Sequence, residues 1–260
     1  MVAVVSSSLN RFALSPRIGN TPSPKVPRGA DGFEHAPAKI IPHPRAASVS
    51  DPRFVEVALS RMATANGDEI QEVQRAYRAA RDLPPNLKNN VGLVRGYMVE
   101  ALGREELARR FPGHQVDHGV EIRKGAHDNV LGELDAIVIR EADGKVAAVA
   151  EAKASVEKMS GGLTKVRAHL ARIQGSEVNH YQTRGDKRVW HFDDSEGPHA
   201  RSTFANVPQS RCFAVGPKNA PDRPDYVRIQ VSEGSIGGIA ALIVAQSREA
   251  KIASPMPMAA

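Results

Sequence analysis

The segment spanning residues 132–153 constrains the fold of this chain more than any other part of the sequence. Two apolar runs, residues 136–139 and residues 146–150, lie on either side of a short polar stretch. Within that stretch, an Ala-Asp-Gly sequence at residues 142–144 has the makeup of a three-residue hairpin loop with glycine in the left-handed position. The segment therefore predicts an antiparallel β-hairpin, and strands this apolar are expected to be buried on both faces.

Acidic residues lie at matching positions of the two predicted strands. A three-residue loop pairs Glu141 with Lys145, and counting back along both strands then sets Asp135 directly opposite Glu151. Directly opposed residues in an antiparallel pair lie about 5 Å apart at Cβ. Because side chains alternate along a strand, Lys153 shares the face of Glu151. We therefore expect two carboxylates and one ammonium group to crowd together near the strand ends.

Adjacent carboxylates at a buried position repel each other, and one takes up a proton unless a cation lies between them. Glu133 lies on the same face as Asp135 and adds a third acid. Ligands that are all oxygen favour Mg²⁺ or Mn²⁺. Lys153 could orient or deprotonate a water molecule and offset charge on a phosphate under attack. The pattern thus indicates a metal site suited to phosphodiester hydrolysis.

The order Asp135, fifteen residues, then Glu151-x-Lys153 resembles the motif of the PD-(D/E)xK nuclease superfamily, which has the restriction-endonuclease-like fold. The Gly-Glu-x-Asp form of the first motif is similar to that of the Holliday-junction-resolvase-like and bacterial toxin branches. The resemblance covers about residues 88–232, and Leu134 stands where many members have proline. It implies an α/β fold with an αβββαβ core, in which helices flank a mixed central sheet.

The resemblance also implies roles for individual residues. Asp135 and Glu151 would be metal ligands and Lys153 the catalytic lysine, with Mg²⁺ or Mn²⁺ as the cofactor. Many members add a glutamate from the first core helix, and Glu100 is our candidate for that catalytic and metal-binding role. It lies on the apolar face of a helix predicted over residues 90–110, so it would point toward the sheet. That apolar face comprises Leu93, Val94, Tyr97, Met98, Ala101 and Leu102. The competing candidates, Glu105 and Glu106, fall in the more polar last turns.

The helix after Lys153 usually faces the substrate in this superfamily, and we expect four of its residues to bind nucleic acid: Lys165, His169, Arg172 and Gln174. The first three recur at i, i+4 and i+7 and so share one helical face. A solvated face is the alternative interpretation, but beside this site phosphate contact is favoured for the group. A later stretch mixes basic and aromatic residues that suit backbone contact or base stacking, namely Tyr181, Arg184, Lys187, Arg188 and Trp190.

The remaining elements follow from periodicity and from residues that end helices. Helices are predicted over residues 51–82, 90–110, 156–174 and 235–248, strands over residues 116–122, 211–216 and 225–232, and a polar loop over residues 175–210 that holds one short strand at 188–192. Asp51 would cap the first helical region. The sequence Asn66-Gly67-Asp68 would divide this region into two helices and cap the second one. The glycines at 161–162 would delay the start of their helix. This order is typical of an α/β sheet covered by helices.

Composition divides the chain into four regions. Residues 1–50, rich in proline and serine, lack a sustained period and are expected to be a disordered leader. Residues 51–86 would form a helical N-terminal subdomain, residues 87–250 the nuclease-like catalytic domain, and residues 251–260 a flexible tail. The formal net charge of +6 and the pI of about 9.6 favour anionic partners such as nucleic acid.

Three further features narrow the function. The chain has one cysteine, Cys212, so an intramolecular disulfide is excluded; without a Cys-His pattern, we expect a small buried strand residue. The spacing of His114 and His118 would suit zinc on a helix, but this stretch enters a strand, and ordinary histidines are favoured. The apolar run at residues 236–245 is too short to span a membrane, and the N-terminus lacks the pattern of a Sec signal peptide.

These observations favour a metal-dependent nuclease with DNA preferred over RNA. We expect an antibacterial toxin or effector, either cytoplasmic or secreted into a target cell by a route that needs no Sec signal, with an acidic immunity protein as its inhibitor. A nuclease of DNA repair, restriction or recombination is one alternative, and a toxin that cleaves transfer RNA or other RNA is another. The third, a non-catalytic nucleic-acid-binding module, fits less well because it has no need for Asp135, Glu151 and Lys153 together.

Overall fold

A computed structural model describes residues 48–124, 129–175, 180–183 and 203–253. The leader expected at 1–50 and the tail expected at 251–260 lie almost wholly outside these residues, as do the basic and aromatic side chains at 184–190 and the strand expected at 188–192. None of the described helices is long and apolar enough to cross a membrane.

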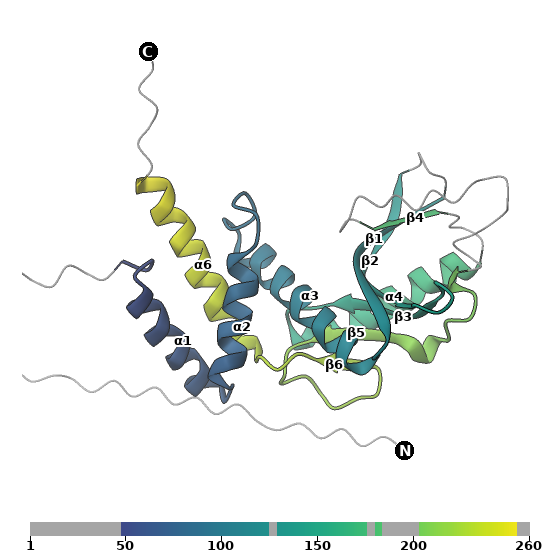
Figure 1. The fold of residues 1–260 in the computed structure, drawn as a ribbon, viewed down its shortest axis with the longest axis horizontal. Coiled ribbons are helices and arrows are strands. Elements are labelled where there is room, and N and C mark those ends of the chain that lie inside the picture. Colours follow the sequence, from purple (N-terminus) through teal and green to yellow (C-terminus); the bar gives the residue numbers. More distant parts are fainter. Residues whose placement is uncertain (1–47, 125–128, 176–179, 184–202, 254–260) are drawn as a thin grey trace, which may run out of the picture. The chain divides into compact units, whose positions relative to one another are not determined.

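The centre of the protein is a six-stranded mixed sheet with the order β4-β1-β2-β3-β5-β6 (Figure 1). The strands are β1 (His114–Arg123), β2 (Val130–Arg140), β3 (Val146–Ala152), β4 (His180–Thr183), β5 (Cys212–Gly216) and β6 (Tyr226–Arg228). Strands β4, β1, β2 and β3 pair antiparallel, whereas β5 runs parallel to β3 and β6 parallel to β5. The expected α/β class with a mixed sheet is confirmed. Two details differ from the prediction. Strand β4 pairs with β1 where a loop was expected, and β6 ends at Arg228 although the strand was expected to continue to residue 232.

Within the described residues, five α-helices accompany the sheet: α1 (Pro52–Asn66), α2 (Ile70–Arg81), α3 (Val91–Arg110), α4 (Met159–Gln174) and α6 (Glu233–Ala253). Short 3₁₀ turns, η1 (Val156–Lys158) and η3 (Gln209–Arg211), precede α4 and β5. Asp51 caps α1 as expected, since its side chain accepts a hydrogen bond from the backbone N–H of Arg53. The side chain of Asn90 caps α3 in the same way. Helix α6 is longer than expected at both ends.

The helices cover the two faces of the sheet unequally. Helices α1, α2, α3 and α6 share one apolar core with Val138, Ala148 and Phe213 of the sheet, and α4 packs on the opposite face against Ile137 and Val149. Cys212 is fully buried in β5, as expected, and burial raises the pKa of its thiol to about 11.

The buried face of α3 agrees with the expected one in part. Val94, Met98 and Leu102 are fully buried, as expected, whereas Leu93 is 49% exposed. Residues four apart form one row along a helix, and the row of Val94, Met98 and Leu102 packs into the core, while Leu93 belongs to a neighbouring row.

The expected hairpin between β2 and β3 is present, but its turn is not a three-residue loop. The backbone N–H of Arg140 donates to the carbonyl of Lys145, and that of Gly144 donates to the carbonyl of Arg140. Arg140 therefore closes the turn in place of Glu141. Gly144 has the left-handed φ of 66° expected for this position.

A β-bulge restores the register that the turn changes. It lies just after Val138, and beyond it Ala136 faces Ala150. Continued by one residue, the same register sets Asp135 opposite Glu151, as the sequence predicts. The turn shifts the strand pairing by one residue from the predicted register, and the bulge shifts it back by one residue, so the two shifts cancel.

Strands β1 and β2 bend along their length, and Figure 1 shows both as long curved ribbons. Gly119 of β1 has φ 58°, a conformation that other residues rarely adopt. On one side of the bend Ala136 belongs to the core under α3; on the other side Leu134 belongs to the core under α4. Asp135 lies at the point where the strand changes faces, so its partly buried side chain belongs to neither apolar core.

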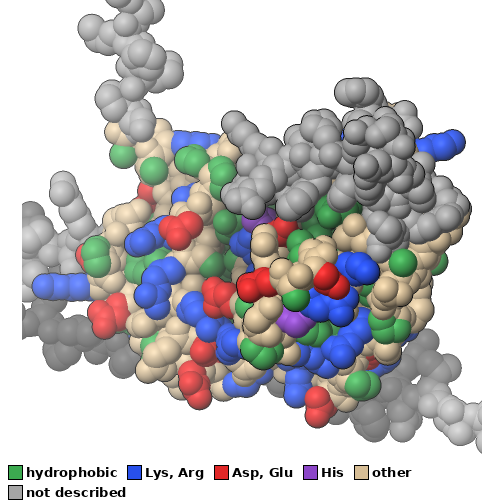
Figure 2. Space-filling model, turned by 45° about the vertical axis from the view of Figure 1, so that its right-hand side comes forward, with side chains coloured by type: hydrophobic (Ala, Val, Ile, Leu, Met, Phe, Trp, Pro, Cys, Tyr) green, Lys and Arg blue, Asp and Glu red, His purple; other side chains and the backbone are tan. Residues whose placement is uncertain are grey.

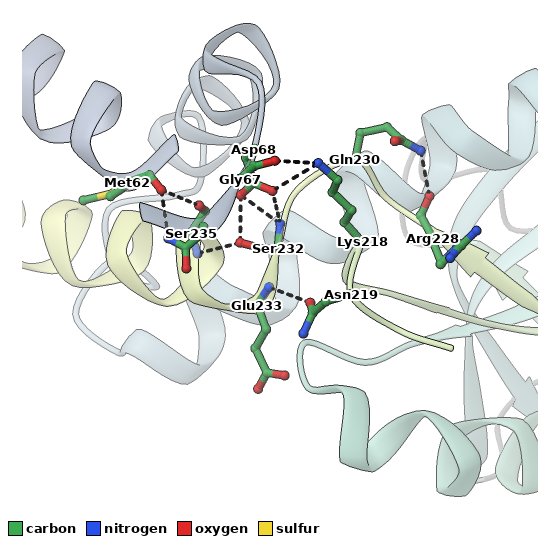
Figure 3. Close-up of polar contacts among 11 residues, drawn as sticks. Met62, Gly67, Asp68, Lys218, Asn219, Arg228, Gln230, Ser232, Glu233 and Ser235 are labelled. Carbon is green, nitrogen blue, oxygen red and sulfur yellow. Dashed lines mark hydrogen bonds and ion pairs between the residues drawn. The ribbon is translucent and has the colours of Figure 1, made fainter. Parts of the chain in front are cut away.

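The chain enters α6 through a junction held by Asp68 (Figure 3). The Asp68 side chain is fully buried and accepts hydrogen bonds from the backbone N–H of Ser232 at 3.0 and 3.1 Å and from its hydroxyl at 2.7 Å. The Ser232 hydroxyl in turn accepts from the backbone N–H of Ser235, which caps α6. The sequence predicts that Asp68 caps α2, but its side chain does not do so. Glu69 precedes that helix, without a side-chain cap.

Replacing Asp68 with alanine should lower the free energy of unfolding by about 2–4 kcal/mol, because a buried N–H and hydroxyl lose their acceptor. Urea unfolding of both proteins measures the difference. Asp82→Ala is the matched control: its side chain is exposed at the end of α2, so the change should stay within about 0.5 kcal/mol. Equal effects of the two substitutions would contradict the assigned role of Asp68.

Candidate active site

The structure brings together the four residues expected to form the site. Asp135 lies on β2, Glu151 near the end of β3, Lys153 directly after β3 and Glu100 on α3. The backbone N–H of Ala152 donates to Asp135 Oδ2 at 2.6 Å, which ties the two strands together at the site. Glu100 interacts electrostatically with Asp135 and Glu151, so it faces the same cluster.

The competing glutamates of α3 lie elsewhere. Glu105 and Glu106 form ion pairs with Arg75 of α2, at 3.4 and 3.8 Å. Glu106 also pairs with Arg109 at 2.6 Å. Of the glutamates compared, Glu100 is therefore the one that α3 presents to the cluster.

Glu151 is the most deeply buried acid of the cluster, with a side chain 1% exposed. Strand β3 carries it there because the strand pairs with β2 on one side and β5 on the other and packs under α4. Its Oε1 accepts from Lys153 Nζ and from Lys165 Nζ, each at 2.6 Å. Its Oε2 is buried and accepts no hydrogen bond within the described part of the chain.

Lys165 is the member of this cluster whose position sequence reasoning missed. It was expected to contact nucleic acid from α4, and the structure adds a direct bond to Glu151. Register counting along the hairpin reaches Lys153 but not a residue on the following helix. The one available signal was the i, i+4, i+7 spacing that it shares with His169 and Arg172.

That spacing does describe one face of α4, and the face lies along β2. The His169 ring packs against the backbone at Gly132, where a Cβ atom would lie 2.6 Å from Nε2. Arg172 donates to the carbonyl of Leu131 at 3.4 Å and keeps an exposed side chain. The His169 side chain is buried, and burial, followed by the nearby Lys165 charge, lowers its pKa.

Gln174, the fourth residue expected to bind nucleic acid, is engaged by the protein itself. Its side-chain amide donates to the carbonyls of Phe204 and Val207 at 3.1 and 2.9 Å. Gln174 and the buried His169 therefore support the fold around the site. Lys165 and Arg172 keep exposed side chains. Lys and Arg side chains gather beside acidic and histidine side chains on the face that Figure 2 shows.

The positive charge near the acids of the site is too small to offset their negative charges. The pKa of Glu100 is raised to about 7, first by burial and then by the negative charges of Asp135 and Glu133. The pKa of Asp135 is raised to about 6 by burial and by Glu151, although the bond from Ala152 N–H and the lysine charges act in the opposite direction. A cation placed among these groups would relieve both effects.

The donor set fits a divalent cation. Its ligands would all be carboxylate oxygens, the kind that Mg²⁺ and Mn²⁺ prefer, and the unpartnered, buried Oε2 of Glu151 is available to one. As the side chains lie, no group of three His, Cys, Asp or Glu residues among those described converges tightly enough to hold a metal ion. Two lysine ammonium groups occupy Glu151 Oε1 in this arrangement.

Comparisons with known proteins give no relative of this chain: no protein-family model, no curated protein and no solved structure matches it. The function is therefore inferred from the geometry of the site.

Two adjacent glycines of α4 differ in what surrounds them. They were expected to delay the helix, yet both lie inside it. A Cβ atom at Gly162 would lie 2.9 Å from Cγ of Lys153 and 3.4 Å from Cγ of Glu151, whereas nothing lies within 4 Å of one at Gly161. The close packing of α4 on the site thus depends on Gly162.

Gly161→Ala should raise the free energy of unfolding by about 0.5–1 kcal/mol, because alanine loses less backbone entropy in a helix. Gly162→Ala should lower it by about 1–3 kcal/mol, because the added methyl group pushes against the base of the Lys153 side chain. Urea unfolding of the two variants provides the comparison. Stabilisation by both substitutions would show that α4 has room at the site.

The raised pKa of Glu100 predicts a pH-dependent stability. A carboxyl group whose pKa rises on folding stabilises the protein below its unfolded value, and this stability is lost as the pH rises through the folded value, here from about 4.5 to about 7. In EDTA, Glu100→Gln should therefore be more stable than wild type by about 1–3 kcal/mol at pH 8 and nearly equal at pH 4.5.

Thermal or urea unfolding at several pH values measures this gap. Glu105→Gln, at an exposed position of the same helix, should stay within about 0.5 kcal/mol of wild type throughout. A gap for Glu100→Gln that does not change with pH would contradict the assigned burial of this carboxyl group among other acids.

Proposed function

We propose that this protein is a metal-dependent nuclease that hydrolyses phosphodiester bonds, with DNA as the favoured substrate. One observation carries the proposal: Asp135 and Glu151 meet across β2 and β3, and Lys153 contacts Glu151 at 2.6 Å in a cluster short of positive charge. A surface hairpin with simple salt bridges would not bury Glu151 to 1% exposure or leave one of its oxygens unpartnered.

The order of elements supports the same proposal. Helix α3 is followed by the antiparallel strands β1, β2 and β3, then by α4 and by β5, which runs parallel to β3. This is the αβββαβ order of the restriction-endonuclease-like fold, which we propose for residues 87–250. Asp135 on β2, Glu151 on β3 and Lys153 directly after β3 also support the proposal.

Asp135 and Glu151 would hold Mg²⁺ or Mn²⁺, with Glu100 as a further ligand. When bound, the cation supplies positive charge that stabilises the transition state of phosphodiester hydrolysis. Lys153, held by Glu151 and by the carbonyl of Ala152 at 3.1 Å, can donate to a phosphate oxygen or orient the attacking water. The exposed Lys165 and Arg172 can contact the substrate backbone.

Among nucleases we favour a toxin or effector delivered into another cell over an enzyme of repair, restriction or recombination. A Pro- and Ser-rich, mildly basic segment precedes the proposed catalytic domain, and the formal net charge is +6. An acidic immunity protein would complement that charge. Expression of the wild type should then arrest cell growth, and Lys153→Met should relieve the arrest.

Purified wild type should cleave plasmid DNA in Mg²⁺ and not in EDTA. Asp135→Asn and Lys153→Met should each lower the rate by more than about 100-fold, because each removes a group that acts on the transition state. Glu105→Gln is the control for loss of a charge from α3 and should keep the wild-type rate. Total RNA, incubated in parallel, decides between DNA and RNA as substrate.

Folded wild-type protein that leaves both DNA and RNA intact in Mg²⁺ and in Mn²⁺ would overturn the proposal. Binding of nucleic acid without cleavage would then favour the non-catalytic alternative. Cleavage that persists in both variants would place the chemistry outside this cluster.

A further inference from the structure

We propose that Lys165 is an exchangeable counter-ion of the site: it neutralises Glu151 in the metal-free protein, a divalent cation displaces it, and its released ammonium group then binds a phosphate of the nucleic acid. The inference rests on the proposed function and concerns how metal binding and substrate binding depend on each other. The starting observation is that two ammonium groups share one carboxylate oxygen, each at 2.6 Å.

One of these two lysines is fixed in place. Lys153 has its backbone N–H bonded to the carbonyl of Val215 at 2.8 Å, and its ammonium group also donates to the carbonyl of Ala152. The base of its side chain packs against Gly162, where even a methyl group would come within 2.9 Å. Its side chain is 25% exposed. Lys153 is therefore the more firmly held of the two lysines at Glu151.

The other lysine is free to leave. Lys165 reaches the site from α4 with a side chain that is 45% exposed. Among the described residues, Glu151 is the one acceptor of its hydrogen bonds. A long side chain held at its tip by a single bond can turn toward solvent by rotating about its own χ angles, without any movement of the backbone.

The charges of the site favour exchange. Lys165 interacts with Asp135 and Glu133 as well as with Glu151, so it supplies positive charge where a cation held by Asp135 and Glu151 would also supply it. The two ammonium groups that share one carboxylate oxygen also repel each other. The two positive charges of Mg²⁺ or Mn²⁺ exceed the one of lysine, so Lys165 is the group that yields.

The released side chain has a use on the same surface. Arg172 lies two helical turns after Lys165 on the same face of α4 and is exposed. Together the two side chains would present two cations at the edge of the metal site. Metal binding would thereby strengthen contact with the phosphate backbone, which delays tight binding of nucleic acid until the site is ready to act.

The test measures Mn²⁺ binding to the full chain without nucleic acid, by isothermal titration calorimetry or from the electron paramagnetic resonance signal of free Mn²⁺. Lys165→Met should bind Mn²⁺ about tenfold more tightly than wild type, because the competing cation is gone. Lys165→Gln should show the same sign. Arg172→Met, a loss of positive charge from the same helix face without a bond to Glu151, should change the affinity much less.

A second readout follows the released ammonium group. In the Lys153→Met background, where the proposed function predicts cleavage slowed by more than about 100-fold, DNA binding is measured over a range of salt concentrations. With Mg²⁺, adding Lys165→Met should reduce the salt slope by about one, the value for one lost phosphate contact. In EDTA the two proteins should show equal slopes.

The outcomes separate the two proposals. Tighter Mn²⁺ binding by the Lys165 variants supports the inference, whereas unchanged or weaker binding overturns it and leaves the nuclease proposal standing. A wild type that is folded but binds no Mn²⁺ contradicts both. Equal reductions of the salt slope with and without Mg²⁺ would show that Lys165 contacts DNA without exchange, and this also overturns the inference.

Discussion

Glu151 is almost completely buried, and a carboxylate in such a place needs positive charge or hydrogen-bond donors directly against it. The local structure meets this requirement from two directions. Lys153 follows Glu151 by two residues in the chain, and Lys165 reaches Glu151 from α4, which packs on the sheet. The approach of α4 depends in turn on Gly162, which lets the helix backbone come close to both charged side chains. The packing of one helix on the sheet is thus tied to the neutralisation of one acid.

The two lysines do not offset the negative charges of the other acids, Asp135 and Glu100. Asp135 emerges where β2 changes faces, and Glu100 approaches from α3, so both lie at the border between the two apolar cores. Burial and mutual repulsion raise their pKa values toward neutrality. Groups of this kind cost stability without a cation, and a cation bound among them would make their charged forms favourable.

The sequence was informative where a contact depends on counting along one element or one hairpin. Asp135 and Glu151 could be placed opposite each other, and Glu100 on its helix, because strand and helix periods fix such relations. The turn was misjudged by one residue, and a bulge that no pattern announces cancelled the error. The bond from Lys165 to Glu151 and that from Asp68 to Ser232 join separate elements. They depend on how helices dock, which periodicity leaves undetermined.

The position of α6 in the chain has a consequence for biosynthesis. Helix α1 buries Leu59, and helix α2 buries Val73, in the same core as Ile236 of α6, and the Asp68 side chain accepts its hydrogen bonds from Ser232. During translation these helices can complete their packing only after Ser232 has been made, 164 residues after Asp68. The core under α3 closes only when nearly all of the described chain has left the ribosome, so a nascent chain would hold the acids of the proposed site on an unfinished support.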